Sequence, residues 1–249
     1  MQLQGLAATN IIKQNLLDKT SKLRELTLVD WRDASATISN DYSGWSRLES
    51  LHISNCDLQR FPLLPLTIRH LTISTDWGLR AASFTASQRI AANDISQLES
   101  LVLKDIFNIK LIDILSMLRE GGSLKLLHIS RCLEVSSADL LQMLTSNTTK
   151  DVVDLALVDM LGVDDDLVGV ISDMKHLQSL DLSGNTTLDG VGVKRLISKS
   201  GVMLNKLRLK GCKNVGHDAV DRARQIGIEV DFEMADWDYR YKDRFRHWR

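Results

Sequence analysis

Three cysteines, Cys56, Cys132 and Cys212, are the residues of this 249-residue chain with the widest range of possible chemistry. Each closes a copy of the pattern L-x-x-L-x-(L/I)-x-x-C, as in LKLLHISRC (124–132). Thiolates can hold a metal, act as nucleophiles or form disulfides. An odd number of cysteines with no secretion signal favours a reducing compartment over a disulfide framework. Their identical sequence context calls for a structural explanation as well.

Other residues that could bind metal or catalyse a reaction lack the spacing that such sites need. The Asp run VDDDLVG (163–169) has neither the D-x-D-x-D-G order nor the distal Glu of a calcium loop, and is typical of a helix start. His52 and His70 would lie roughly 8 Å apart on neighbouring strands, with no third ligand nearby. No nucleophile elbow, phosphate loop or HExxH motif occurs. We therefore expect no metal, no cofactor and no catalytic residue.

One leucine template, L-x-x-L-x-L, recurs along nearly the whole chain at spacings of about 20 to 30 residues. Leu3 is part of an earlier, degenerate copy, and residues 228–232 alternate like a closing strand. The eight registers are Leu23/Leu26/Leu28, Leu48/Leu51/Ile53, Ile68/Leu71/Ile73, Leu98/Leu101/Leu103, Leu124/Leu127/Ile129, Val152/Leu155/Leu157, Leu177/Leu180/Leu182 and Leu204/Leu207/Leu209.

This period predicts an α/β fold, a leucine-rich repeat solenoid spanning residues 1–235 in about eight or nine repeats. Each repeat contributes a short strand to a curved parallel sheet on the concave face. The chain then returns along the convex face as a helix, and residues 135–147 and 188–201 show helical spacing. Stacking of neighbouring repeats supplies the core that no single repeat can form.

The ninth template position, which Cys56, Cys132, Cys212 and Asn185 occupy, is where the chain leaves the strand and turns inward. A small side chain that tolerates polar surroundings can bond the freed backbone of that turn. Cys56 and Cys132 are separated by two further strands, too far for a disulfide. We therefore interpret these four residues as a structural spine, with buried and inert thiols.

The sequence after three of these turns resembles the cysteine-containing class of leucine-rich repeats. The matching segments are CKNVGHDAVDRARQIGIEVDF (212–232), NTTLDGVGVKRLIS (185–198) and, more loosely, CLEVSSADLLQML (132–144). The ending ARQIGIEVDF with its aromatic and basic tail is similar to fungal F-box proteins. The resemblance implies that the repeats hold a substrate or partner for a Skp1–cullin ubiquitin ligase, without catalytic activity of their own. It further implies, more remotely, engagement of a nuclear assembly such as the replication machinery.

The sequence contains no F-box, and it opens directly in a repeat without a polar cap. We therefore expect the chain to be a fragment of a longer protein or to pack against another chain, with Skp1 and cullin reached only through an F-box elsewhere. A leucine-rich repeat adaptor or assembly factor without a ubiquitin link remains the alternative, and a nucleic-acid-associated module a further one. With no signal peptide and no membrane span evident, we expect the nucleus or cytoplasm.

Outward-facing positions of the predicted strands form a mostly small and polar surface that suits a protein ligand better than a small molecule. Its candidate partner-binding residues are His52, His70, Lys104, His128, Asp154, Asp181, Lys206, Arg208 and Lys210.

Lys206, Arg208 and Lys210 alternate along one strand, so their charges repel unless an anion is near. Acidic residues of this chain such as Asp181, Asp236 and Asp238 could neutralise them. An acidic or phosphorylated partner is the alternative, with Arg208 as the bidentate donor.

The C-terminal tail, residues 236–249, holds five of the thirteen aromatic residues among five cations. It could cap the last repeat or fold back along the concave face, dock on another protein, or bind single-stranded nucleic acid. Its candidate contact residues are Trp237, Tyr239, Arg240, Tyr241, Arg244, Phe245 and Trp248.

Overall fold

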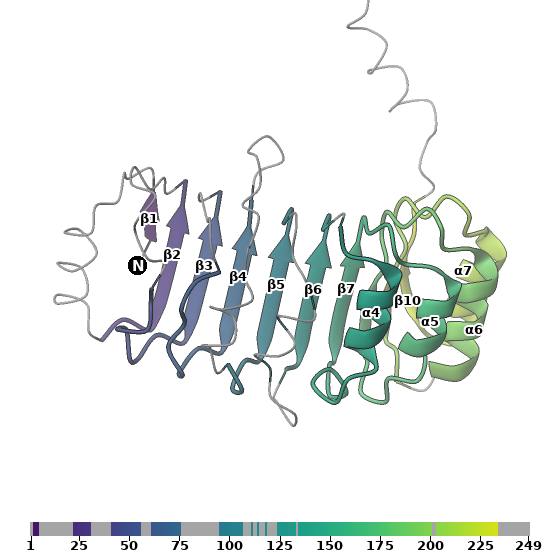
Figure 1. The fold of residues 1–249 in the computed structure, drawn as a ribbon. Helices are drawn as coiled ribbons and strands as arrows, with labels where there is room; N and C mark the ends of the chain where they lie inside the picture. The colour runs from purple at the N-terminus through teal and green to yellow at the C-terminus, as the bar shows by residue number, and fades with distance from the viewer. Residues whose placement is uncertain are drawn as a thin grey trace, which may run out of the picture.

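Ten parallel strands form one open sheet whose order follows the sequence from β1 to β10 (Figure 1). The computed structural model describes residues 2–4, 22–30, 41–55, 61–75, 95–106, 111, 114, 118, 124–132, 134–200 and 203–233. The strands are β1 (Gln2–Gln4), β2 (Glu25–Val29), β3 (Ser50–Ser54), β4 (His70–Ser74), β5 (Ser100–Lys104), β6 (Leu126–Ser130), β7 (Asp154–Val158), β8 (Ser179–Asp181), β9 (Lys206–Arg208) and β10 (Glu229–Asp231). A strand therefore lies at every one of the eight predicted registers, and at both predicted flanking copies.

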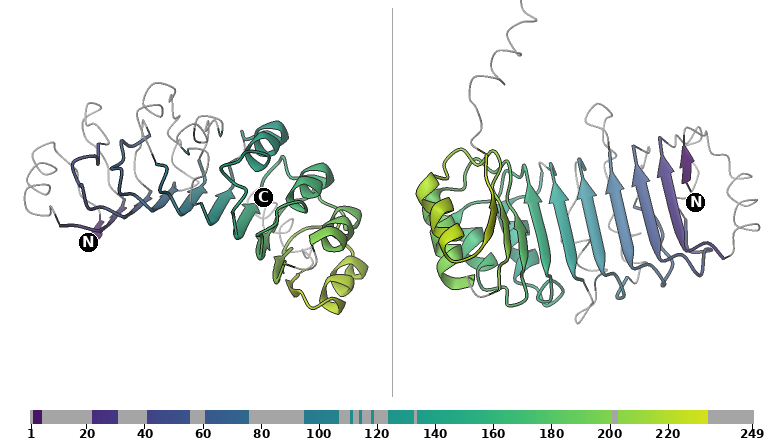
Figure 2. Two further views of the ribbon diagram at one scale, coloured as in Figure 1. Left: turned by 90° about the horizontal axis from the view of Figure 1, so that it is seen from below. Right: turned by 180° about the vertical axis from the view of Figure 1, so that it is seen from behind.

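The helices follow the later strands and lie on one side of the sheet. They are α4 (Ser137–Leu144), α5 (Asp165–Ile171), α6 (Gly190–Ser200) and α7 (His217–Gln225). In Figure 2 the row of strands bends, and the green and yellow helices run along its outer side. The two helical returns predicted at 135–147 and 188–201 are thus confirmed as α4 and α6. The architecture is an α/β fold with a single open parallel sheet, compatible with the predicted solenoid.

The template leucines place alternate side chains of each strand in the core, because side chains of a strand alternate between its two faces. The burial pattern of β3 shows this: Leu51 and Ile53 are buried, and the residues beside them are half-buried. Strand pairing is in register, so Leu51 lies beside Leu71 and Leu71 beside Leu101. Like residues therefore stack from strand to strand, and one continuous core extends through the repeats.

Side chains at the helix starts satisfy backbone N–H groups that have no partner within the helix. Ser136 and Asp139 form a capping box at the start of α4. The Asp164 side chain accepts a hydrogen bond of 2.9 Å from the Leu167 N–H at the start of α5. The Asp run of residues 163–169 thus begins a helix, as its sequence predicts.

The returns that lead into β3 and β4 are built differently from the predicted helices. The described residues 41–49 and 61–69 form turns, and Asp41 pairs with Leu63 in an isolated parallel bridge. The second of these returns contains both prolines of the chain, which prevent regular helix there. In the first, Tyr42 and Trp45 are buried and stack with ring centroids 5.8 Å apart. Large aromatic groups here cover the sheet where helices cover it later, and the described parts of these two returns, residues 41–49 and 61–69, contain no helix.

Replacing Leu71 by Ala tests the alternation that organises the sheet. Leu71 is fully buried, so truncation should leave a cavity and lower the free energy of unfolding by about 2–5 kcal/mol. Thr72→Ala, on the half-buried face of the same strand, is the matched control and should stay within about 0.5 kcal/mol. Urea unfolding followed by circular dichroism measures both changes. Equal losses in the two variants would contradict the assignment of faces.

Candidate binding face of the sheet

Among the residues that the structure describes, no helix covers one of the two faces of the sheet. We define the inner face as the side chains at the first, third and fifth residue of each strand from β2 to β10, continued through Ser183, Lys210 and Glu233 where the strand is shorter. Most of these side chains are half-buried. The residues between them are buried, except Val230 and Phe232, which are half-buried. Parallel sheets are normally covered on both faces, so the inner face is the candidate binding surface.

Two of the predicted contact histidines lie on neighbouring strands but out of register. His52 on β3 pairs with Thr72, whereas His70 on β4 pairs with Ser50. The strand spacing and rise then place the two histidines roughly 8 Å apart. No group of three or more metal-ligating side chains occurs among the residues the structure describes.

His128, the third predicted histidine, lies near the middle of the inner face on β6, between Val102 and Ala156. Burial lowers its pKa below the ordinary value, and the charge of Lys104 lowers it further, against the opposing effects of Asp181 and Asp154. The imidazole is therefore neutral at pH 7. A neutral ring contributes aromatic surface to the middle of this face.

The three predicted cations in and just after β9 (hereafter the β9 cations) each have an acidic partner on an adjoining strand. Lys206 Nζ lies 3.2 Å from Glu229 Oε1, and Arg208 Nη1 lies 3.6 Å from Asp181 Oδ2. Lys210 Nζ lies 3.2 Å from Asp231 Oδ2. This geometry favours neutralisation within the chain.

Two of these acids, Glu229 and Asp231, were missing from the sequence analysis. The signal that could have found them is the alternation of residues 228–232, because Glu229 and Asp231 stand in register with Lys206 and Arg208. The other two acids proposed there, Asp236 and Asp238, lie outside the described residues. So do all the predicted contact residues of the tail, namely Trp237, Tyr239, Arg240, Tyr241, Arg244, Phe245 and Trp248.

Asn185, a member of the predicted spine, joins two neighbouring repeats through three hydrogen bonds. Its amide nitrogen donates to the carbonyl groups of Leu157 and Leu182, each at 2.7 Å. Its side-chain oxygen accepts from the Met160 N–H at 3.0 Å. The side chain is fully buried, so these bonds replace water for three backbone groups.

The two described cysteines occupy the equivalent place and are free thiols. Cys212 Sγ donates to the Leu182 carbonyl at 3.0 Å, and Cys132 Sγ lies 3.5 Å from the Ser130 carbonyl. Burial raises the pKa of both thiols to about 11. They are therefore protonated at neutral pH, and a protonated thiol is a poor nucleophile and metal ligand. Cys56 lies outside the described residues.

A second recurring feature of the turns, a backbone conformation one residue before the spine position, was missed by the sequence analysis. The backbone there is left-handed, and its N–H donates to a carbonyl on the following strand; Arg131 N–H, for example, bonds Val158 O at 3.0 Å. Asp, Asn and Gly tolerate this conformation best, so their recurrence before the spine position was the available signal. The residues with positive φ at this position are Asp30, Asn55, Asp105, Arg131, Asp159, Gly184 and Gly211.

Arg131 and Asp105 form a bidentate ion pair across two of these turns. Arg131 Nε and Nη2 donate to the two carboxylate oxygens of Asp105 at 2.5 and 2.6 Å. Asp105 is almost completely buried, and its hydrogen bond raises the pKa of Arg131. The pair fixes the edge of the inner face beside His128.

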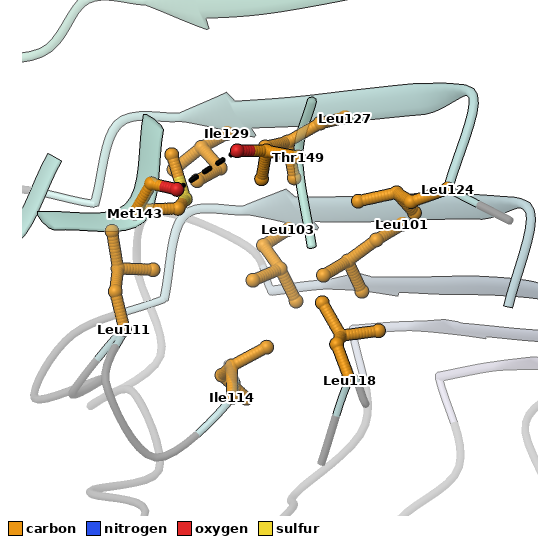
Figure 3. A pocket seen from close by; sticks show the side chains of 10 residues that line it. All are labelled: Leu101, Leu103, Leu111, Ile114, Leu118, Leu124, Leu127, Ile129, Met143 and Thr149. Carbon is orange, nitrogen blue, oxygen red and sulfur yellow. Dashed lines mark hydrogen bonds between the residues drawn. The ribbon is translucent and has the colours of Figure 1, made fainter. Parts of the chain in front are cut away.

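The enclosed cavity under β5 and β6 is too small and too apolar to hold a ligand (Figure 3). It offers about 10 Å³ to the centre of a water molecule, room for one water at most. Its only polar lining side chain is Thr149, whose hydroxyl donates to the Met143 carbonyl at 2.8 Å. The cavity is a packing feature of the core.

Comparisons with known proteins add no relative. A scan against models of protein families finds no match, and a search of curated proteins finds no significant match. Among the described residues, no helix has both the length and the apolar character needed to cross a membrane.

Replacing Asn185 by Ala should lower the free energy of unfolding by about 2–3 kcal/mol, because buried backbone groups lose their partners. Asn185→Cys should lose less stability, because the thiol of Cys212, at the equivalent position of the next repeat, donates to the carbonyl of its own preceding repeat. Thr186→Ala, one residue away and exposed, is the control. Denaturant unfolding measures all three variants. A cysteine variant no more stable than the alanine variant would contradict this role of the spine.

The described thiols should resist alkylation in the folded protein. In a Cys56→Ser background, iodoacetamide at pH 8 should modify neither Cys132 nor Cys212 until denaturant is added, because with a pKa of about 11 roughly one thiol in a thousand is ionised. Mass spectrometry counts the modified thiols before and after unfolding. Rapid modification of the native protein would show that either cysteine is accessible and reactive.

Proposed function

We propose that the chain is a leucine-rich repeat solenoid that binds another protein through its inner face. The observation that carries this proposal is a parallel sheet on which all the described helices, α4 to α7, lie on the same side. An uncovered parallel sheet exposes half-buried side chains along its whole width, and repeat solenoids use such extended concave surfaces for binding. A flat, open face of small polar residues suits a protein surface better than a small molecule.

The repeat class is supported by three independent features. The template registers recur with the period of leucine-rich repeats. The strands pair in sequence order, each with the next. At the turns, Asn185 and Cys212 bond the carbonyl groups of the preceding repeat. Stacked units of one repeating motif account for all three.

The proposed biological role is the partner-recognising part of an F-box subunit in a Skp1–cullin ubiquitin ligase of the nucleus or cytoplasm. Support comes from residues 132–144, 185–198 and 212–232, which resemble the cysteine-containing repeats of that family. In this role the chain is non-catalytic and holds a target close to the ligase. Engagement of a nuclear assembly such as the replication machinery is part of the same proposal.

A nucleic-acid role is less well supported by the geometry. The β9 cations have acidic partners on both sides, Asp181 on β8 and two acids on β10. Phosphate binding would have to displace all three ion pairs. An adaptor without a ubiquitin link would use the same binding face. It would differ from the proposed ligase subunit only in bringing the bound partner to an assembly other than a ubiquitin ligase.

Charged substitutions on the inner face test the proposal. Thr72→Arg and Ser100→Arg place a long cation on β4 and β5 without touching the core, and each should lower recovery of co-purified proteins at least tenfold. The control, Ser198→Arg, adds the same side chain to the exposed outer helix α6. Affinity purification of the full-length protein with quantitative mass spectrometry measures the recovery.

Two outcomes would contradict parts of this proposal. Equal recovery with the inner-face and control variants would remove the inner face as the binding surface. Recovery of inner-face partners without Skp1 or cullin from full-length protein would favour an adaptor over a ligase receptor.

A further inference from the structure

The centre of the inner face differs from the rest in carrying apolar side chains. We define the central patch as Val102 on β5, Leu126 on β6, and Ala156 and Val158 on β7. Val102 and Ala156 pair with His128, and Leu126 precedes it by two residues on the same face. Val158 follows Ala156 by two residues and pairs with Ser130. Ala156 is buried, and the other three are half-buried. Elsewhere on the described inner face of β2 to β10, Val29 is the only other apolar residue. The patch is therefore a local apolar surface set in a polar one.

His128 adds to the apolar character of the patch. It is half-buried, and burial together with Lys104 keeps its ring neutral at pH 7. An uncharged aromatic ring among aliphatic groups makes a surface from which water is readily displaced. Apolar centres inside a polar rim are the usual anatomy of protein interfaces.

Two opposite charges stand at opposite corners of this patch. Lys104 is the last residue of β5, and Asp154 is the first residue of β7. Neither forms an ion pair with another described residue, in contrast to the three β9 cations. Two strand spacings and four residues of rise separate their Cα atoms by roughly 16 Å. The face thus offers a cation and an anion on either side of an apolar centre.

We propose that the central patch binds a peptide segment of a partner protein that carries an apolar side chain between one acidic and one basic residue. The apolar side chain would lie on Leu126 and Val102, the acidic residue near Lys104 and the basic residue near Asp154. An extended segment covers roughly 16 Å in about five residues. This inference rests on the proposed binding role of the inner face and narrows its partner to one pattern of charge.

Other occupants fit these residues less well. Asp154 and Asp181 lie on the same side of the patch and would repel a phosphate backbone. A second copy of the chain would have to place its own acidic and basic side chains over Lys104 and Asp154, and the test below includes that outcome.

Selection from a displayed library of random twelve-residue peptides tests the inference. The wild-type protein should enrich peptides with an apolar residue between one acid and one base about five residues apart. Lys104→Glu should instead enrich peptides with two basic flanks, and Asp154→Lys peptides with two acidic flanks. Single charge reversals are used because a peptide could satisfy a double reversal by binding in the opposite direction.

Affinities of a selected peptide, measured by fluorescence polarisation, complete the test. Leu126→Arg should weaken binding at least tenfold, because it places a charge in the apolar patch. Leu126→Ser, whose side chain is small and uncharged, should weaken binding less. Ser198→Arg on the outer helix α6 should leave the affinity unchanged, and Ser50→Arg, on the inner face three strands away from Leu126, should weaken binding less than Leu126→Arg does. Thermal melts confirm that every variant is folded.

Each remaining outcome overturns the inference in a distinct way. Loss of binding in Ser50→Arg but not in Leu126→Arg would keep the inner face as the binding surface and reject the central patch. If Lys104→Glu and Asp154→Lys enrich peptides with the same charges as the wild-type protein does, the proposed charge pattern is rejected. Self-association that Leu126→Arg abolishes would assign the patch to a second copy of the chain. Binding that no inner-face variant alters would reject both this inference and the proposed function.

Discussion

The structure depends on how the backbone is satisfied where each strand ends. At that point the chain must turn inward under the helices, and its peptide groups leave both sheet and water. The N–H of a residue in the left-handed conformation donates to a carbonyl of the next strand, as Arg131 N–H does to Val158 O. The side chain of the following residue donates to a carbonyl of the preceding repeat, as Asn185 does to Leu157 O. The turns that contain Cys132, Asn185 and Cys212 are therefore bonded in both directions along the stack, which helps to hold the register of the neighbouring strands.

Those bonds and the described helices occupy the same side of the sheet, so no described helix covers the opposite face. Ion pairs such as Arg208 with Asp181 join partly exposed groups on that face and add little net free energy, since surface pairs contribute only about 0–1 kcal/mol. Stability comes instead from buried leucines such as Leu71, on the other face. Substitutions of half-buried residues on the inner face should consequently disturb the core less than substitutions of these leucines.

Much of this could be predicted from sequence, because the leucine template encodes strand position, direction of side chains and pairing at once. The returns could not be predicted as well. Residues 61–69 turn without a helix since the prolines prevent one, and Tyr42 and Trp45 fill the space that helices fill elsewhere. Asp181 was predicted as a partner of the β9 cations, but Glu229 and Asp231 on β10 were missed, because the closing strand lacks the leucine template and its register was not predicted. The template thus predicts elements and their pairing well, and side-chain contacts less well.

In the proposed binding role, the distribution of paired and unpaired charges determines which part of the inner face would bind a partner most specifically. The three alternating cations Lys206, Arg208 and Lys210 are balanced by Asp181, Glu229 and Asp231, so a ligand that binds there must first break these ion pairs. Lys104 and Asp154 have no such competitor among the described residues, and a partner's charges would meet them without first breaking an ion pair. Between them lies the one apolar area of the face, where exclusion of water strengthens both contacts. The sequence alone draws attention to the charged residues at the end of the sheet. In the proposed binding role, however, a partner would gain most of its free energy of binding at the centre of the sheet.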